Sequence, residues 1–329
     1  MTTICVDVMG SDKEPSVLLE GVTMALEADS DLEVLVAGSE EAISEYCKNT
    51  DRAEPLYCTE VITMSEHPAS AVRHKKDASI VRAAAAVHDG EAEGLFSAGS
   101  TGAILTASTL GVGRIEGIKR PAIALAFPGI SGRKTVFLDM GANADVKPDD
   151  IVQFARMGRA FSKVVLGVDD ARVGLLCNGS EETKGSEMAL AYHKALAEGN
   201  CGFAGNAEGS DILAGTFDVI VTDGFTGNVA LKSIEGTGKF VLARLKEAVN
   251  ESFGNKIGAA LLKGTLKSLS NELSGEEYGG AMLLGLRAPV LKGHGATSSK
   301  AVCQGTLSAA SFARAKLPQA IAEACKLDD

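Results

Sequence analysis

The sequence predicts an α/β protein with a mostly parallel sheet sandwiched by helices. Short runs of β-branched and other apolar residues alternate with longer stretches of helical periodicity, as in strands joined by crossover helices. Val219-Ile220-Val221 is apolar at every position, which is typical of a strand buried on both faces of a sheet. Glycine makes up 37 of 329 residues, above the usual ~7%, and this excess indicates many tight turns.

The amino-terminal half contains the first alternation. A strand is expected at residues 3–8, and a helix at 15–28 begins with Pro15, which is favoured in a first helical turn. The other elements expected here are a strand at 32–37, helices at 39–48 and 77–87, a strand at 94–97, a helical stretch from Ala103, and strands at 122–127 and 135–138.

The carboxyl-terminal half continues the alternation. We expect a helix at 149–166, a strand at 173–177, a helix at 186–198, a strand at 218–222 and a long helix at 228–250. No proline- or serine-rich linker divides the chain. Residues 1–329 are therefore expected to form a single α/β chain of two interleaved lobes.

Residues 236–273 have a different pattern, which predicts a protruding helical hairpin. Apolar residues recur every three to four positions, and the spacing restarts after Gly254. The wide apolar stripe indicates core packing or a dimer bundle. The alternative is that the tip also touches a membrane surface, because lysines flank an apolar turn. The apolar positions are Val241, Leu245, Val249, Phe253, Ile257, Leu261, Leu266, Leu269 and Leu273, and the lysines are Lys256, Lys263 and Lys267.

Composition excludes several classes of function. The net charge of −11 and the pI of about 5.1 disfavour nucleic-acid binding, which needs a concentrated basic face. No apolar run reaches the ~18 residues of a membrane span, and the first residues lack the basic leader of a signal peptide. Seven scattered cysteines without a C-x-x-C pair predict reduced thiols and a cytoplasmic location and disfavour zinc, and no residue is assigned as a metal ligand.

Five predicted strands are followed by polar, glycine-containing loops. Because ligands of open α/β sheets bind outside the carboxyl ends of strands, we expect these loops to converge on one crevice. The loops cover residues 7–12, 97–102, 139–143, 178–185 and 223–228. Together with His294, they supply the candidate substrate-binding residues Asp7, Gly10, Ser97, Gly99, Ser100, Thr101, Gly102, Asn143 and Asp223.

For each candidate an ordinary structural role competes with a functional one. The 97–102 loop precedes a helix and suits a phosphate or carboxylate, but it could equally be a capped turn without a ligand. Lys184 could be a surface lysine paired with a glutamate, and Asn228 could cap the long helix. Asp223 could hold its loop by an Asx-turn, and a lone histidine such as His294 is more often structural.

Several familiar catalytic signatures are missing. The chain has no G-x-G-x-x-G, no P-loop, no G-x-S-x-G and no H-x-x-x-x-D, so no covalent nucleophile stands out. Basic residues do form three islands, which are either solvated faces or docking sites for an acidic partner. The islands are Arg73, Lys75 and Lys76, then Arg114, Lys119 and Arg120, and finally Arg133 and Lys134.

In this order, the loops resemble those of bacterial phosphate acyltransferases over nearly the whole chain. The family usually reads D-A-M-G-G-D and S-A-G-N-T-G-A where this chain has Asp7-Val8-Met9-Gly10-Ser11-Asp12 and Ser97-Ala98-Gly99-Ser100-Thr101-Gly102-Ala103. Departures at Val8, Ser11, Ser100 and Met282 affect fine geometry. The other matches are Arg120-Pro121-Ala122, residues 138–143, Glu181-Glu182-Thr183-Lys184-Gly185, residues 218–229 and residues 278–285.

The resemblance implies a fold similar to isocitrate dehydrogenase and phosphotransacetylase, and a homodimer formed through helices. It implies no cofactor, peripheral contact with the inner face of the membrane, and catalytic roles for Lys184 and Asn228. The implied reaction converts acyl-ACP (acyl carrier protein) and inorganic phosphate into acyl phosphate and free ACP for phospholipid synthesis. Two alternatives are a phosphotransacetylase-like enzyme that uses acyl-CoA and a non-catalytic scaffold of lipid enzymes on the membrane. A nicotinamide-dependent dehydrogenase is disfavoured by the missing fingerprint.

Such a reaction needs few catalytic groups. A thiol has a pKa of about 8.5, so the thiolate leaves readily when phosphate attacks the thioester. The site must capture phosphate, align it and stabilise an oxyanion. We assign phosphate capture to the 97–102 loop with the charge of Lys184, and the carbonyl oxygen to the amide of Asn228. Alternatively, Lys184 serves the oxyanion.

Overall fold

The computed structural model describes residues 1–264 and 279–326. Residues 265–273 of the predicted hairpin, and Tyr278, lie outside this description. Within the described ranges the strands form one eleven-stranded sheet in the order β3-β2-β1-β4-β11-β10-β5-β6-β9-β7-β8. Most neighbouring pairs are parallel, as predicted.

The sheet consists of two parallel blocks that point in opposite directions. One block contains β1 (Thr2–Asp7), β2 (Leu32–Gly38), β3 (Ala53–Tyr57), β4 (Gly94–Ser97) and β11 (Val290–Lys292). The other contains β6 (Lys134–Leu138), β7 (Val173–Leu176), β8 (Phe203–Ala207) and β9 (Val219–Val221).

The reversal occurs at β10 (Ala281–Leu284) and β5 (Ala122–Pro128). These strands pair antiparallel with each other, β10 pairs antiparallel with β11, and β5 pairs antiparallel with β6. As a result, the carboxyl ends of β1, β4 and β11 lie at one edge of the sheet and those of β6, β7 and β9 at the opposite edge.

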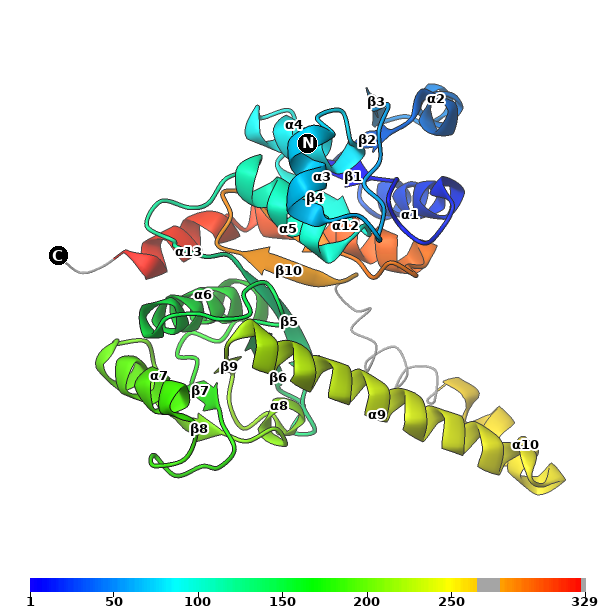
Figure 1. The fold of residues 1–329 in the computed structure, drawn as a ribbon. Helices are drawn as coiled ribbons and strands as arrows, with labels where there is room; N and C mark the ends of the chain where they lie inside the picture. Colours follow the sequence, from blue (N-terminus) through cyan, green and yellow to red (C-terminus); the bar gives the residue numbers. More distant parts are fainter. Residues whose placement is uncertain (265–278, 327–329) are drawn as a thin grey trace.

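Helices cover both faces of the sheet (Figure 1). One apolar core lies under α1 (Pro15–Ala28), α2 (Glu40–Asn49), α6 (Pro148–Leu166), α7 (Glu187–Glu198), α12 (Ser299–Arg314) and α13 (Leu317–Cys325). The core of the other face lies under α3 (Pro68–His74), α4 (Ser79–His88), α5 (Thr101–Leu110), α8 (Asp211–Ala214) and the beginning of α9 (Gly224–Asn250).

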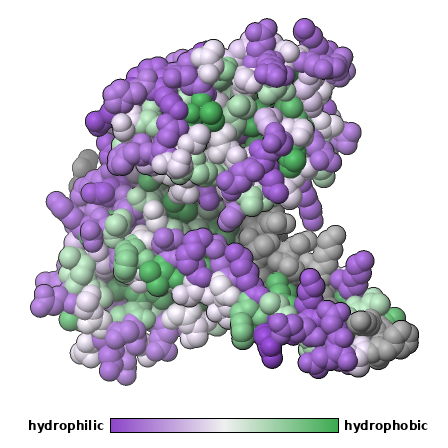
Figure 2. Space-filling model, turned by 45° about the vertical axis from the view of Figure 1, so that its right-hand side comes forward, coloured by the Kyte–Doolittle hydropathy of each residue, from purple (hydrophilic) through white to green (hydrophobic). Residues whose placement is uncertain are grey.

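The chain passes between two lobes more than once (Figure 1). The first block of strands lies in the upper lobe and the second block in the lower lobe, with β10 and β5 between them. After the lower lobe the chain returns to pack α12 against α1 and β4, and α13 then packs against α6. Figure 2 shows that the molecule is hollowed between the upper lobe and the lower lobe that carries α9.

Sequence periodicity misses several elements. Strands β10 and β11 have only four and three residues, and they lie in a glycine-rich segment. Their pairing depends on neighbours far away in the chain, so local pattern does not reveal them. Strands β3 and β8 and helices α3, α8, α12 and α13 were also not predicted. Helix α9 begins at Gly224 rather than at Asn228.

Helix α9 extends far beyond the lower lobe, and α10 (Phe253–Leu261) follows it (Figure 1). The part of α9 beyond the core exposes Phe240, Val241 and Leu245, whose exposed fractions are 65%, 54% and 39%. Such a run of large apolar side chains is unusual for a free surface. No helix among the described residues is long and apolar enough to cross a membrane.

Candidate active site

The first group of candidate residues surrounds the carboxyl ends of β1, β4 and β11. Asp7 is buried and accepts hydrogen bonds from Ser97 Oγ at 2.7 Å and from the backbone N–H of Met9 at 3.0 Å. Ser97 Oγ also accepts a hydrogen bond from Gly99 N at 3.2 Å. Gly10 has φ +73°, and its neighbours are Ile62 O and Gly99 Cα. Asp7, Gly10, Ser97 and Gly99 therefore hold the two loops together beneath the surface.

Burial raises the pKa of Asp7 to about 6, against the lowering effect of its hydrogen bonds. The folded state thus keeps a proton that the unfolded chain releases at lower pH. The contribution of Asp7 to stability is full below about pH 4 and is lost as the pH rises through about 6.

Asp7→Asn removes this titration. We expect the stability of the variant relative to wild type to grow by about 2 kcal/mol between about pH 4 and about pH 8. Urea unfolding at both pH values tests this, and a constant difference would contradict it.

The accessible part of this group is the start of α5. Ser100, Thr101 and Gly102 are partly exposed, and no side chain caps the helix at Ser100. The first amides of α5 are therefore free to bind an anion, and the helix dipole favours negative charge there.

Lys292 and His294 complete the group. Lys292 pairs in register with Ser97 on the neighbouring strand, and Gly293 N donates to Ser97 O at 2.8 Å. Lys292 is half-buried, and its amino group has no hydrogen-bond partner among the described residues. Burial lowers the pKa of Lys292 and of His294. His294 is exposed, and its Nδ1 accepts a hydrogen bond from Ala296 N at 3.2 Å. The group thus presents a lysine beside the start of α5.

The second group lies at the opposite edge, where β6 and β9 end. Buried Asp139 binds the loop that follows it through five hydrogen bonds, from the N–H groups of Ile123, Gly141, Ala142 and Asn143 and from Asn143 Nδ2. Asn143 Nδ2 also donates to Pro121 O at 2.8 Å. Both amide donors of Asn143 are thus engaged within the protein, and Asn143 positions the loop.

The start of α9 packs directly on this loop. Gly224 N donates to Asn143 O at 2.8 Å, and a side chain at Gly227 would overlap Asp139 O. Asp223 caps the helix, because it accepts bonds from Thr226 N and Thr226 Oγ1 at 2.8 and 2.9 Å. The alternative that Asn228 caps the helix is therefore wrong. Asn228 lies beyond the first turn, against Gly141, with its amide exposed and unpaired among the described residues.

Lys184 lies in the loop after β7, at the same edge as Asn228. It is exposed, and its backbone N–H donates to Glu181 O at 3.0 Å. Because β7 and β4 run in opposite directions, Lys184 is not adjacent to the 97–102 loop through the sheet. The five loops therefore lie in two groups, and not in the single group expected from parallel strands.

Helix α9 connects the two groups. Asn228 and Lys232 are four residues apart, so they share one face of the helix at a separation of about 6 Å. The charges of Lys232 and Glu235 act on both Lys292 and His294. Helix α9 thus carries the exposed amide of Asn228 at one edge of the sheet and, one turn later, a lysine whose charge acts on Lys292 of the other edge. Within residues 1–264 and 279–326, no cluster of three His, Cys, Asp or Glu residues could hold a metal ion.

Comparison with known proteins identifies the family of the chain. Residues 2–320 match the model of a family described as "Fatty acid synthesis protein". Proteins named phosphate acyltransferase from Lysinibacillus sphaericus and Bacillus licheniformis are 44% and 45% identical over 299 residues, which cover 91% of this chain and 91% of each relative. The chain belongs to the phosphate acyltransferase family.

Solved structures support the fold of this phosphate acyltransferase. A phosphotransacetylase from Streptococcus pyogenes superimposes with a TM-score of 0.58 at 17% identity, covering 96% of this chain and 94% of that one. A branched-chain phosphotransacylase from Enterococcus faecalis gives a TM-score of 0.56 at 14% identity, covering 95% of this chain and all of the other. At such identities the likeness establishes the fold alone, which is the fold expected from the sequence resemblance.

Sequence reasoning did not single out Lys292 as a candidate. It stands between a strand too short to recognise and a glycine-rich loop. The available signal was its place two residues before His294, which was itself a candidate. The charge that acts on Lys292 comes from Lys232 of α9, a distant part of the chain, and no local pattern contains that information.

Proposed function

We propose that this phosphate acyltransferase transfers an acyl group from acyl-ACP to inorganic phosphate, giving acyl phosphate and free ACP for phospholipid synthesis. One observation carries the site assignment. Helix α9 carries the free amide of Asn228 and, one turn later, Lys232, whose charge acts on Lys292 beside the uncapped start of α5. The amide of Asn228 is a donor for a developing oxyanion, and Lys292 together with the start of α5 is a cationic site for phosphate.

In the proposed reaction, a phosphate oxygen attacks the carbonyl carbon of the thioester. A C–O bond forms, the C–S bond breaks, and the electron pair leaves with the thiolate. Because the pKa of a thiol is about 8.5, the leaving group needs no strong general acid. The first amides of α5, with Ser100 and Thr101, hold the phosphate together with Lys292.

Asn228 donates to the carbonyl oxygen as its negative charge develops. The exposed Lys184 is at the same edge of the sheet as Asn228, which supports its assignment to the oxyanion over its assignment to phosphate. His294 contributes a neutral imidazole beside Lys292, because burial lowers its pKa. Asp7, Asn143 and Asp223 position backbone in this proposal and do not touch substrate.

The role of Lys292 predicts a selective kinetic defect. Lys292→Met removes one charge-assisted hydrogen bond to phosphate, worth about 1.5–3 kcal/mol, so the KM for phosphate is expected to rise about 10–100-fold. The KM for acyl-ACP is expected to change less than about twofold, because in this proposal Lys292 contacts inorganic phosphate and not the acyl donor. Steady-state kinetics with each substrate varied in turn measures this split. Equal effects on both KM values would contradict the role, and Lys292→Arg should restore part of the affinity.

The exposed apolar side chains of α9 and α10 support an additional proposal. Two copies of the chain pair through Phe240, Val241 and Leu245, and the tip with the exposed Leu261 and Leu262 contacts the inner face of the membrane from the cytoplasm. Light scattering of the purified chain tests the dimer. Flotation with anionic vesicles tests the membrane contact.

The activity is tested directly by incubating the purified chain with palmitoyl-ACP and phosphate and trapping acyl phosphate with hydroxylamine. The expected product requires both phosphate and the ACP thioester. Product from acyl-CoA but not from acyl-ACP would replace the proposal with a phosphotransacetylase-like activity. A folded chain that forms no acyl phosphate from either thioester would support a scaffold role instead.

A further inference from the structure

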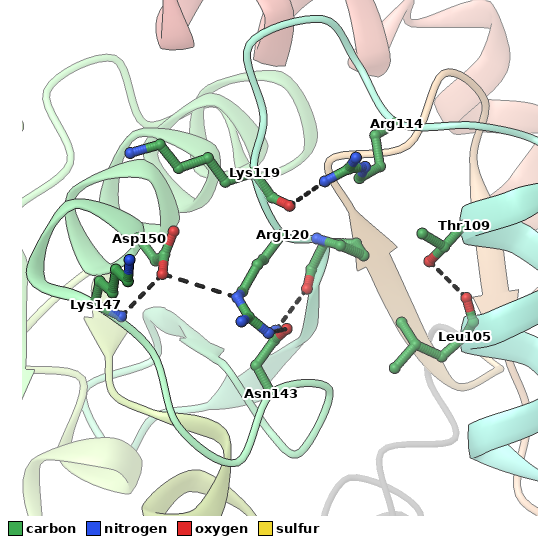
Figure 3. A pocket seen from close by; sticks show the side chains of 9 residues that line it. Leu105, Thr109, Arg114, Lys119, Arg120, Asn143, Lys147 and Asp150 are labelled. Atoms are coloured by element: carbon green, nitrogen blue, oxygen red, sulfur yellow. Dashed lines mark hydrogen bonds and ion pairs between the residues drawn. The ribbon is translucent and has the colours of Figure 1, made fainter. Parts of the chain in front are cut away.

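A basic pocket adjoins the second group of site residues. It has a volume of about 470 Å³ and lies between α5 of one lobe and the start of α6 of the other (Figure 3). Its wall contains four cationic side chains, Arg114, Lys119, Arg120 and Lys147, and one carboxylate, Asp150. In a chain of net charge −11, this local excess of positive charge needs an explanation.

Lys119 is paired with Asp149 outside the pocket wall, at 3.1 Å between Nζ and Oδ2, and Asp150 alone does not balance the other three cations. Asp150 is buried and accepts a hydrogen bond from Lys147 N at 2.9 Å at the start of α6. Arg120 lies between Asp150 and Asn143, but its contacts are long, at 3.9 Å from Nε to Asp150 Oδ2 and 3.4 Å from Nη1 to Asn143 Oδ1 (Figure 3). A guanidinium has five N–H donors, so most of those of Arg120 stay free for an anion.

The pocket is separate from the site at the start of α5. Thr109 lines the pocket and is eight residues after Thr101, which corresponds to about 12 Å along the helix. A single phosphate ion cannot contact both places. The partly buried apolar residues Leu105, Leu125 and Ala281 pack on the same core face, and Ala281 pairs with Lys292. Two cationic regions thus lie along α5, one at its start and one in the pocket, with partly buried apolar residues on the core face that α5 covers.

The proposed reaction brings together two phosphate groups in different chemical forms. One is inorganic phosphate. The other is the phosphodiester through which the prosthetic arm of a carrier protein is attached, at a distance from the thioester. The pocket has the size of a small-molecule site, and Leu105, Thr109 and Pro121 add less polar surface to its cations. These properties suit a phosphate ester with a carbon chain better than a bare ion.

We infer that the pocket of Arg114, Arg120 and Lys147 binds the phosphodiester of the carrier's prosthetic arm, while the thioester extends toward Asn228. This inference rests on the proposed function. Asn143 is in the pocket wall and Gly141, two residues away, contacts Asn228, so the pocket and the proposed oxyanion donor share one loop. The pocket would then distinguish thioesters that carry a phosphate ester from those that do not.

The test uses two small donors with the same thioester, palmitoyl-phosphopantetheine and palmitoyl-pantetheine, and the full chain. Wild type is expected to prefer the phosphorylated donor about tenfold or more in kcat/KM, as for one or two charge-assisted hydrogen bonds. Lys147→Ala and Arg120→Ala are expected to lose this preference while the KM for inorganic phosphate changes less than about twofold. Lys163→Ala is the matched control, because Lys163 is on the same helix, where it pairs with the exposed Asp169.

The outcomes separate the alternatives. A KM for inorganic phosphate that rises about tenfold in the pocket variants would assign the pocket to inorganic phosphate and overturn the inference. A preference that persists in Lys147→Ala and Arg120→Ala, or that wild type lacks, would overturn it as well. Arg120 also contacts Asn143 and Asp150, so Lys147→Ala keeps the test valid if Arg120→Ala does not fold. A wild-type chain that forms no acyl phosphate from any donor would instead refute the proposed function.

Discussion

Asn228→Ala is expected to lower kcat by about 10²–10³, the usual cost of removing one donor from an oxyanion site. The stability should remain close to that of wild type, because Asn228 is exposed and its amide has no hydrogen-bond partner among the described residues. Turnover of palmitoyl-ACP and thermal unfolding of the same preparation measure the two quantities. The KM for phosphate should change little, since phosphate binds at the start of α5 in this proposal.

Asn250→Ala is the matched control for Asn228. It removes an asparagine from the opposite end of the same helix, where Nδ2 donates only to Lys246 O within its own helix. Its turnover should equal that of wild type.

Lys184→Ala should lower turnover at least about tenfold, as expected when an oxyanion loses a nearby charge. Wild-type turnover in both Asn228→Ala and Lys184→Ala would remove these residues from the active site.

Asp139→Ala is expected to cause the largest loss of stability, about 4 kcal/mol or more. Asp139 is fully buried and accepts five hydrogen bonds, four of them from backbone N–H groups, of which those of Ile123 and Asn143 are buried. Each buried donor left unpaired costs about 1–3 kcal/mol. The urea midpoint measures the loss. Because the same loop supports Asn143 and the start of α9, the remaining folded protein should also lose activity.

Asp149→Ala provides the comparison for Asp139. Asp149 is 77% exposed on its side chain and pairs with Lys119 at the surface, so its loss is expected to change stability by less than about 1 kcal/mol. Similar destabilisation by both substitutions would mean that the hydrogen bonds of Asp139 are not what holds this loop. A loss above that of Asp149→Ala but without loss of turnover would separate the loop from catalysis.

Local patterns were sufficient for several parts of the molecule. The alternation of apolar strands and amphipathic helices predicted most of the elements up to residue 250, because backbone periodicity determines which side chains can share a buried face. The polar loops at strand ends predicted which residues to examine, and the motifs around them matched the family. The capping role of Asp223 was not predicted, because the helix was expected to begin at Asn228, whereas it begins at Gly224.

Tertiary structure alone decided how these parts meet. Pairing of β10 and β5 with neighbours distant in the chain reverses the sheet, and this reversal separates the loop of Ser97 from that of Asn143. Sequence patterns do not contain strand direction, because parallel and antiparallel pairs can bury the same apolar residues. The effect of the charge of Lys232 on Lys292 and the pocket around Arg120 depend on how the two lobes meet. The sequence thus determined which residues carry chemical groups, and long-range packing decided which of those groups face one another.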